Sequence, residues 1–301
     1  MQLSTALIFD KLLSERTKKK TEKFILVVAI ISFLVHLLLI YLKDFKIIHL
    51  RSDNILLTNP ISAIYTPFSF ILLYEVYLLI YYLSKSITIY IGKQYEIITL
   101  IIIRRVFKDL SILNLSSDWF HIKDDLKFTY DIVASLLLFY LLYFFYAKSY
   151  KKNTVYNDEK VLSVKIRRYV IFKKIISIIL IPILLGLSLY SFTNWTIDAF
   201  LNSASGENGF RNINNIFFDE FFKILIIVDV LVLLMSLFYT SEFHKVMRNS
   251  GFIISTILIR LSFSVEGIIN TLLIVSSVIF GLSVLLIHNK YEKSDPEKEP
   301  S

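Results

Sequence analysis

The chain has 301 residues, of which 55% are hydrophobic and 19% are charged, and its mean hydropathy is +0.62. This composition is typical of an integral membrane protein and unlike that of a soluble globular domain. The sequence contains no cysteine, which excludes disulfides, cysteine-ligated metals and thiol catalysis within it. The formal net charge of +8 comes from basic residues beside apolar runs, so we interpret it as a determinant of membrane topology and expect no nucleic-acid partner.

Residues 1–23 form a basic and partly amphipathic N-terminal segment. In residues 3–14, leucine and isoleucine lie among polar neighbours, which suits either a short helix on the membrane surface or a frayed tail. Residues 16–23 carry five basic side chains and directly precede an apolar run at 24–42. Because this run is long for the apolar core of a cleaved signal sequence, we expect it to remain as the first membrane anchor.

Six apolar runs are each long enough to cross a hydrocarbon core of ~30 Å as an α-helix. Two further apolar segments, 95–115 and 251–263, are weaker because arginine interrupts them. We predict an all-α transmembrane bundle of eight spans, with seven as the alternative. Residues 251–288 would form a hairpin turning at Glu266-Gly267 in the first case, and one very long helix in the second. The six strong runs are 24–42, 62–83, 130–147, 174–192, 221–240 and 268–288.

The basic segments predict how the spans are oriented. Residues 16–23 and 148–174 are both rich in lysine and arginine, which is typical of cytoplasmic loops. An even number of crossings must connect them, so the weak segment 95–115 has to cross together with the three strong runs. The loops at 116–129 and 193–220 then fall outside. We therefore expect an integral protein of the plasma (inner) membrane with a cytoplasmic N-terminus.

The predicted spans divide into two units of four helices. The first unit covers residues 24–147 and the second covers residues 174–288. A basic cytoplasmic linker at 148–173 joins them, and a polar tail at 289–301 follows.

A short internal similarity suggests that the two units are repeats. Residues 96–104 align without gaps with residues 252–260 and share four isoleucines and a final arginine. A span with one acid near its middle precedes each copy, Glu75 in the first and Asp229 in the second. Parallel repeats related by an axis along the membrane normal are common among transporters and channels. Isoleucine is so abundant in this chain that chance alignment is the alternative.

Segment 95–115 contains four charges that make it costly to insert into a membrane. An Arg, Lys or Asp at a helix centre costs about 2.5–3.5 kcal/mol, and about a dozen apolar residues at roughly −0.5 kcal/mol each cannot offset all four. We therefore expect this helix to line the bundle interior, beside water, anions or acidic partners. Asp131, near the outer end of its span, is a candidate partner for Arg105 or Lys108. The four charges are Arg104, Arg105, Lys108 and Asp109.

Acidic residues near the middle of other spans are the expected partners of the remaining arginines. We predict an ion pair between Glu75 and Arg104, because both lie at similar depth if their helices are centred in the membrane. Asp229 and Arg260 offer the same pairing in the second half. The complete predicted site comprises Glu75, Arg104, Arg105, Lys108, Asp131, Asp229 and Arg260.

These charges favour a channel or transporter-like protein with a charged intramembrane pathway for ions or protons. The alternative is a non-catalytic membrane subunit or sensor, in which the same charges hold helices together or dock a partner, including a second copy of the chain. Voltage sensing is disfavoured, because the positive residues do not recur at every third position. The sequence contains no glycine-rich phosphate loop, zinc-hydrolase motif or nucleophile elbow. We therefore expect no enzymatic activity, no cofactor and no metal site.

Overall fold

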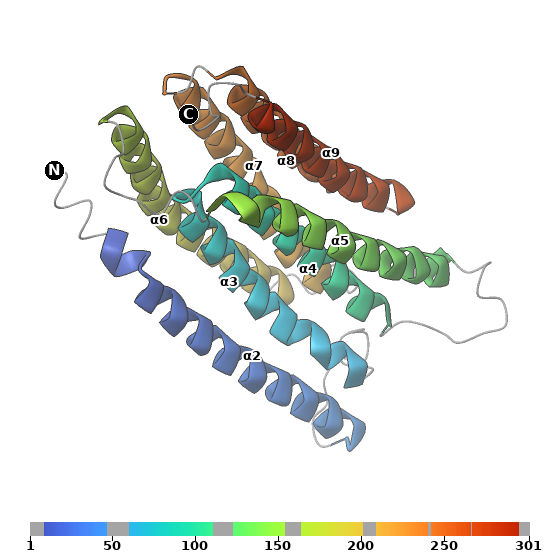
Figure 1. Cartoon of the computed structure of the whole chain (residues 1–301). Helices are drawn as coiled ribbons and strands as arrows, with labels where there is room; N and C mark the ends of the chain where they lie inside the picture. The colour runs from blue at the N-terminus through green and yellow to red at the C-terminus, as the bar shows by residue number, and fades with distance from the viewer. Residues whose placement is uncertain are drawn as a thin grey trace.

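The computed structural model describes residues 9–46, 60–110, 123–153, 164–200, 209–239, 242–265 and 267–294. Within these ranges the chain is almost entirely helical and contains no strand, which confirms the predicted all-α class. Long α-helices follow one another along the sequence (Figure 1). The elements are α2 (Glu15–Asp44), η2 (Pro60–Ile64), α3 (Tyr65–Leu83), α4 (Ile87–Leu110), α5 (Lys123–Asn153), α6 (Val164–Phe200), α7 (Gly209–Leu237), α8 (Phe243–Ser262) and α9 (Ile268–Lys293).

Five of these helices are long and apolar enough to cross a membrane, judged by length and composition over the described residues. They are α2, α3, α5, α6 and α9. The chain is therefore a helical bundle with several membrane-compatible helices, as the apolar runs predict. Three helices are not among the five. α4 and α8 correspond to the arginine-containing segments expected to be weak, and α7 contains the strong run predicted at 221–240.

The first long helix begins and ends where elementary capping rules place its ends. The Ser14 hydroxyl oxygen accepts a hydrogen bond from the Thr17 backbone N–H at 3.1 Å, which satisfies one of the free donors of the first turn. Glu15 in the first turn and Lys43 in the last turn both complement the helix dipole. Just before this helix, Phe9 and Leu13 are buried against the bundle, so these two side chains pack on protein and not on the membrane surface. Residues 3–8 of the predicted surface helix lie outside the described residues.

Helices α8 and α9 form a hairpin. α8 ends at Ser262, and Gly267 precedes α9 with φ +74°, a conformation that glycine adopts without strain. The two arms then pack closely, because a Cβ on Gly251 would lie only 2.7 Å from Cγ2 of Val284. One uninterrupted helix over residues 251–288 is therefore excluded.

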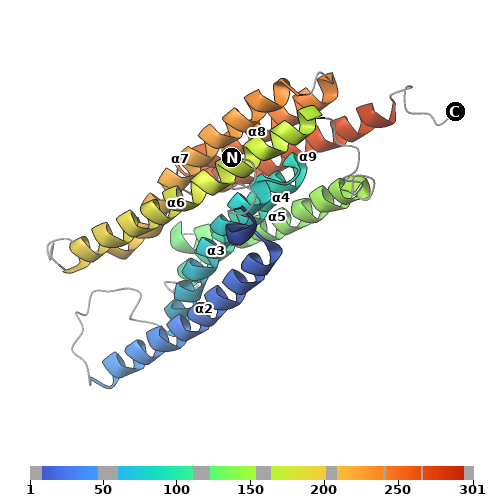
Figure 2. The ribbon, with the colours of Figure 1, turned by 90° about the vertical axis from the view of Figure 1, so that its left-hand side faces the viewer.

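Among the α-helices of the described ranges, five pack in a closed order and three cover them from outside. α3, α4, α8, α7 and α6 contact one another in that sequence, and α6 returns to α3. α2 packs on α3 at one edge of the bundle, as Figures 1 and 2 show. α5 and α9 pack against each other and over α4 and α8, respectively.

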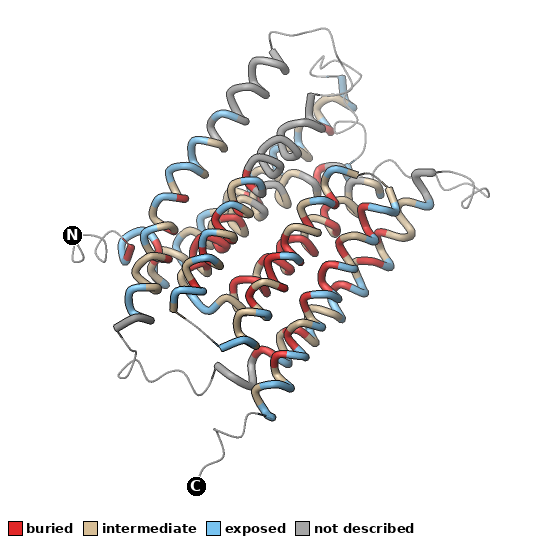
Figure 3. Tube along the Cα trace, turned by 90° about the horizontal axis from the view of Figure 1, so that it is seen from above, coloured by how far each residue is buried: buried red, intermediate tan, exposed pale blue. Residues whose placement is uncertain are grey.

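The most buried helix of the first half is α4, the one that the cost of its arginines predicts to lie inside. Its side chains Tyr95, Ile97 and Ile98 are completely buried. In Figure 3, buried residues concentrate on the central helices. The outermost helix, α2, exposes large apolar side chains such as Phe24 at 66% and Ile30 at 61%. In a membrane this pattern is favourable, because the exposed apolar surface contacts lipid.

Several helices extend beyond the apolar runs that predict them. α4 begins at Ile87, eight residues before the predicted start of its span. α5 continues to Asn153 and α6 begins at Val164, so both ends of the predicted linker at 148–173 are helical. Lysine and arginine are good helix formers, so a helix need not end where its apolar run ends. The division into two units stays a prediction.

Candidate functional site

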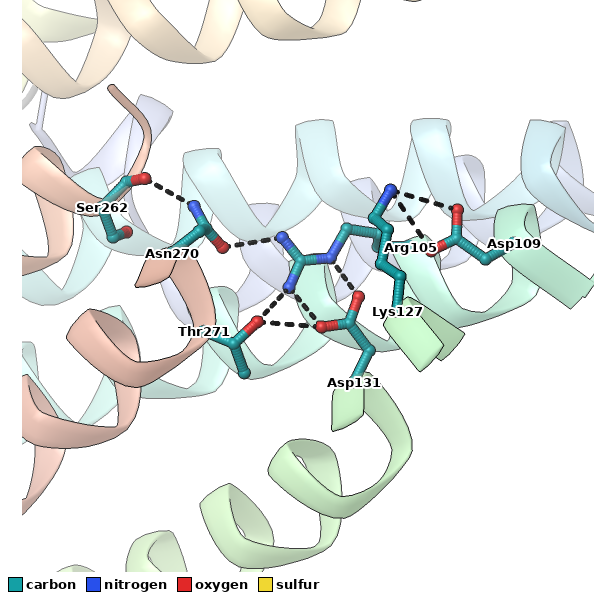
Figure 4. Close-up of polar contacts among 7 residues, drawn as sticks. All are labelled: Arg105, Asp109, Lys127, Asp131, Ser262, Asn270 and Thr271. Atoms are coloured by element: carbon teal, nitrogen blue, oxygen red, sulfur yellow. Dashed lines mark hydrogen bonds and ion pairs between the residues drawn. The ribbon is translucent and has the colours of Figure 1, made fainter. Parts of the chain in front are cut away.

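Arg105 on α4 is the centre of a polar network that joins three helices (Figure 4). Its Nε and Nη2 donate to the two carboxylate oxygens of Asp131 on α5, at 2.5 and 2.6 Å. Nη1 donates to Oδ1 of Asn270 on α9 at 2.7 Å, and Nη2 also donates to the Thr271 hydroxyl at 2.9 Å. The predicted pairing of Arg105 with Asp131 is confirmed.

The residues that contact Arg105 also form hydrogen bonds among themselves and with α8. The Thr271 hydroxyl donates to Oδ1 of Asp131 at 2.9 Å, and the Asn270 amide donates to the Ser262 carbonyl at the end of α8 at 2.5 Å. Asp131 is completely buried, and four of the five N–H groups of Arg105 would be occupied by these contacts. Such a saturated pair holds helices together and leaves little room for a transported ion.

Two other charges accompany this network at the same end of α4. Asp109 lies 3.4 Å from the ammonium group of Lys127, which is partly exposed on α5. Lys108 belongs to α4, but its side chain lies outside the described residues.

Asp229 on α7 is a second buried charge, and it has a different environment. Its Oδ1 accepts a hydrogen bond from the Tyr90 hydroxyl at 2.8 Å, and its Oδ2 accepts one from the Gln94 amide at 3.0 Å. The Thr256 hydroxyl on α8 in turn donates to Oε1 of Gln94 at 2.7 Å. Asp229 is only 3% exposed, so α7, α4 and α8 hold a buried carboxylate with neutral donors.

The predicted pairing of Asp229 with Arg260 is therefore wrong. Asp229 faces the first two turns of α4, whereas Arg260 lies in the last turn of α8. The distances along the helices explain this. Asp229 lies eight residues before the end of α7 and Arg260 seventeen residues after the start of α8, which separates them by about 14 Å in depth at 1.5 Å per residue.

The predicted pairing of Glu75 with Arg104 is wrong for the same reason. Glu75 lies eight residues before the end of α3, and Arg104, which is buried, lies seventeen residues after the start of α4. The charges within electrostatic reach of Glu75 are instead Glu96, Lys93 and Glu22. Its Oε2 is buried without a hydrogen-bond partner in the described part of the chain.

Glu96 next to Glu75 is already engaged by two other side chains. The Tyr146 hydroxyl on α5 donates to Oε1 of Glu96 at 2.5 Å, and Lys93 forms an ion pair with Oε2. Around Glu75, the negative charge of Glu96 is balanced by Lys93, and Glu22 on α2 adds a second negative charge, which leaves the surroundings of Glu75 net negative.

Apolar side chains separate the Asp229 network from the Arg105 network. Arg105 lies eleven positions after Gln94 on α4, which separates them by about 16 Å along the helix axis. Ile97, Ile98 and Ile102 between them are completely buried. Two buried hydroxyl groups lie in this stretch before Arg104. The Tyr95 hydroxyl shares a hydrogen bond with the Ser255 hydroxyl on α8 at 2.7 Å, and the Thr99 hydroxyl donates to the Tyr95 carbonyl of its own helix at 2.8 Å.

Sequence reasoning missed the neutral members of both networks. Tyr90 and Gln94 occupy positions i and i+4 of one helix face, a spacing that the sequence does display. Asn270 and Thr271 are adjacent polar residues at the start of an otherwise apolar run, which is a second visible signal. The described residues contain no group of three or more His, Cys, Asp or Glu side chains arranged to hold a metal ion. No protein-family model, curated protein or solved structure matches this chain.

Proposed function

We propose that this chain is a channel or transporter-like membrane protein in which Asp229 binds and releases a proton or a small cation. The observation that supports this is the environment of Asp229, a buried carboxylate whose hydrogen-bond donors, Tyr90 and Gln94, are both neutral. Asp131 differs from Asp229 in this respect, because the positive charge of Arg105 already neutralises Asp131. Ionisable residues inside a membrane bundle commonly mark ion or proton pathways.

The energetic terms at Asp229 are of similar size and opposite sign. Burying an ionised carboxylate costs several kcal/mol, even after the protein relaxes around it. Two hydrogen bonds to the charged form return roughly 1.5–3 kcal/mol each. Neither the charged nor the neutral form is therefore strongly favoured, and a proton or a cation beside Oδ1 and Oδ2 can shift the balance.

Glu75 is the proposed second carboxylate of the pathway. It lies as far from the end of α3 as Asp229 lies from the end of α7, about 12 Å in each case. Its unpartnered Oε2 and the neighbouring Glu96 favour a positive ligand. Both carboxylates would then be reached from the same end of the bundle.

We also propose that all eight helices cross the plasma (inner) membrane, with the N-terminus in the cytoplasm and two parallel four-helix repeats. Glu75 and Asp229 each lie eight residues before the end of their helices, α3 and α7, which supports the repeat. Arg104 and Arg260 each lie seventeen residues after the start of theirs, α4 and α8, which supports it too. Packing against neighbours allows α4 and α8 to cross despite their arginines.

The topology is tested by cysteine labelling on this cysteine-free background. Ser264→Cys, after α8, should react with an impermeant maleimide added outside cells, and Ser294→Cys, after α9, only after the membrane is opened. Labelling of Ser294→Cys from outside would contradict eight spans.

The transport proposal is tested with purified protein in liposomes that contain a pH-sensitive dye. A potassium gradient with valinomycin sets an inside-negative potential, and wild-type protein should acidify the lumen faster than empty liposomes do. Asp229→Asn removes the exchangeable charge and should abolish this flux. Asp44→Asn, the same change at the exposed end of α2, is the matched control and should leave the flux unchanged.

Sodium and potassium flux is measured in matched liposomes without valinomycin, which itself carries potassium, since a cation can replace the proton at Asp229. Background rates for protons, sodium and potassium in wild-type protein would contradict the proposal. Equal flux in wild type and Asp229→Asn would show that ions cross by another route.

A non-catalytic membrane subunit is the second candidate, and the Arg105 network specifically favours it. That network is saturated, and the buried isoleucines between it and Gln94 resemble a packed core more than an open pore. Background flux together with a partner protein that co-purifies at fixed stoichiometry would support this function.

A further inference from the structure

The side-chain amide of Gln94 on α4 connects the carboxylate of Asp229 on α7 with the hydroxyl of Thr256 on α8. Its nitrogen donates to Oδ2 of Asp229 at 3.0 Å, and its oxygen accepts a hydrogen bond from Thr256 at 2.7 Å. These three side chains are only 2–3% exposed. Buried polar groups find their hydrogen-bond partners within the protein, so the direction of each bond in this chain depends on the others.

The Thr256 hydroxyl has a second acceptor within reach. Its oxygen lies 3.2 Å from the Phe252 backbone carbonyl, one turn earlier on α8, as well as 2.7 Å from the amide oxygen of Gln94. A threonine hydroxyl has one hydrogen and two acceptor lone pairs. It can therefore donate to Gln94, or donate to Phe252 and accept a hydrogen bond from Gln94.

A proton on Oδ2 of Asp229 would make two donors face each other, because the new O–H group would point at the Gln94 N–H group. A buried donor without an acceptor is costly. A half-turn of the amide removes the conflict. Asp229 then donates to the amide oxygen, the amide nitrogen donates to Thr256, and Thr256 donates to the Phe252 carbonyl. Tyr90 continues to donate to Oδ1, as it does to the ionised carboxylate.

No charged group lies close to Asp229 in the described part of the chain. The side chains that act on it are Tyr90 and Gln94 of α4. α6 and α8 also pack on α7, and neither brings a charge within electrostatic reach of this carboxylate. The proton on Asp229 is therefore the charge change to which the amide responds.

We propose that the Gln94 amide reverses its orientation when Asp229 takes up a proton, and that the Thr256 hydroxyl reverses with it. Gln94 and Thr256 are then positioning residues that couple the charge of Asp229 to α8. The inference rests on the proposed function, in which Asp229 exchanges a ligand, and it identifies that ligand as a proton. A dehydrated sodium or potassium ion needs a shell of oxygens in place of its water, whereas one proton completes this network without further ligands.

The test uses the full-length protein in detergent micelles, with glutamine labelled by carbon-13 at the side-chain carbonyl. The sequence contains two glutamines, Gln2 and Gln94, so Gln94→Met assigns the signal. Infrared difference spectra between low and high pH should contain the carboxylic-acid band of Asp229 together with a shift of the labelled amide stretch. Gln94→Met should remove the amide shift and keep the acid band.

Thr256→Val tests the reversal itself. With Asp229 ionised, Thr256 donates to the Gln94 carbonyl, so loss of the hydroxyl should move the labelled stretch to higher wavenumber. With Asp229 protonated, the carboxylic acid is the donor, so the same variant should leave the stretch at its wild-type position. Thr256→Ser keeps the hydroxyl and should match the wild type in both states.

Thr99→Val is the matched control, because it removes a buried hydroxyl of α4 that donates to the Tyr95 carbonyl of its own helix. It should leave the labelled stretch unchanged in both states. An acid band of Asp229 without an amide shift would overturn the reversal and leave the proposed function standing, as would equal shifts by Thr256→Val in both states.

Two other outcomes concern the ligand. An amide shift produced by sodium or potassium at high pH would overturn the assignment to a proton. The absence of an acid band from Asp229 at every pH would overturn the reversal too, and the flux in liposomes would then show whether Asp229 carries a cation.

Discussion

Replacing Asp131 with asparagine should destabilise the protein more than any other single charge removal near α4. The variant keeps the shape of the side chain but removes the charge opposite the 2.5 and 2.6 Å hydrogen bonds from Arg105. Removing one partner of a buried pair costs about 3–5 kcal/mol. The Arg105 side chain is 23% exposed, so water partly stabilises the orphaned cation, and we expect about 3 kcal/mol.

The measurement is the free energy of unfolding in mixed micelles, from titration with sodium dodecyl sulfate. The double variant Arg105→Gln with Asp131→Asn restores neutrality and should cost at least about 2 kcal/mol less than the sum of the two single changes. Lys127→Gln breaks the more exposed 3.4 Å contact with Asp109 and is the control, with an expected loss of about 0–1 kcal/mol. A loss from Asp131→Asn no larger than that of the control would refute the claim that this pair locks α4 to α5.

Two further predictions concern close helix contacts, and both are measured as changes in thermal unfolding. A Cβ on Gly281 would lie 1.7 Å from the Tyr95 hydroxyl oxygen, so Gly281→Ala should cost about 1–3 kcal/mol, and adding Tyr95→Phe should recover part of it. Gly251→Ala should cost a similar amount against the methyl groups of Val284, and Val284→Ala should relieve it. No rescue by the second change would mean that the clash lies elsewhere.

The architecture could be predicted from the sequence because its signals are local. An apolar run of membrane length becomes a helix without reference to its neighbours. The interior position of α4 was also predictable, because Arg104 and Arg105 are too costly to face lipid. The hairpin of α8 and α9 followed from length, since residues 251–288 are far longer than one span needs.

The ion pairs were less predictable because they depend on helix ends and rotation. Placing the span at 95–115 puts Arg105 at its centre, whereas α4 runs from Ile87 to Leu110 and has its midpoint between Ile98 and Thr99. That shift moves Arg104 away from Glu75 and brings Glu96 near it. Apolar runs do not predict how far a helix continues into polar sequence.

The pairing of Arg105 with Asp131 was predictable because it depends mainly on the depth of the two residues in the bundle. Asp131 lies near the start of α5 and Arg105 near the end of α4, and the two helices pack against each other. Two residues near the same end of adjacent antiparallel helices must lie at similar depth. The neutral ligands Asn270 and Thr271 come from α9, which is distant in sequence, and no local pattern predicts that contact.

The most direct test of the central proposal is the charge state of Asp229 itself. Infrared difference spectra of the purified protein, recorded across a pH titration, report the carbonyl stretch of protonated carboxylic acids. We expect a band that disappears as Asp229 loses its proton, that is absent in Asp229→Asn and that persists in Asp44→Asn. A wild-type spectrum that Asp229→Asn reproduces in full would contradict an exchangeable proton at this carboxylate.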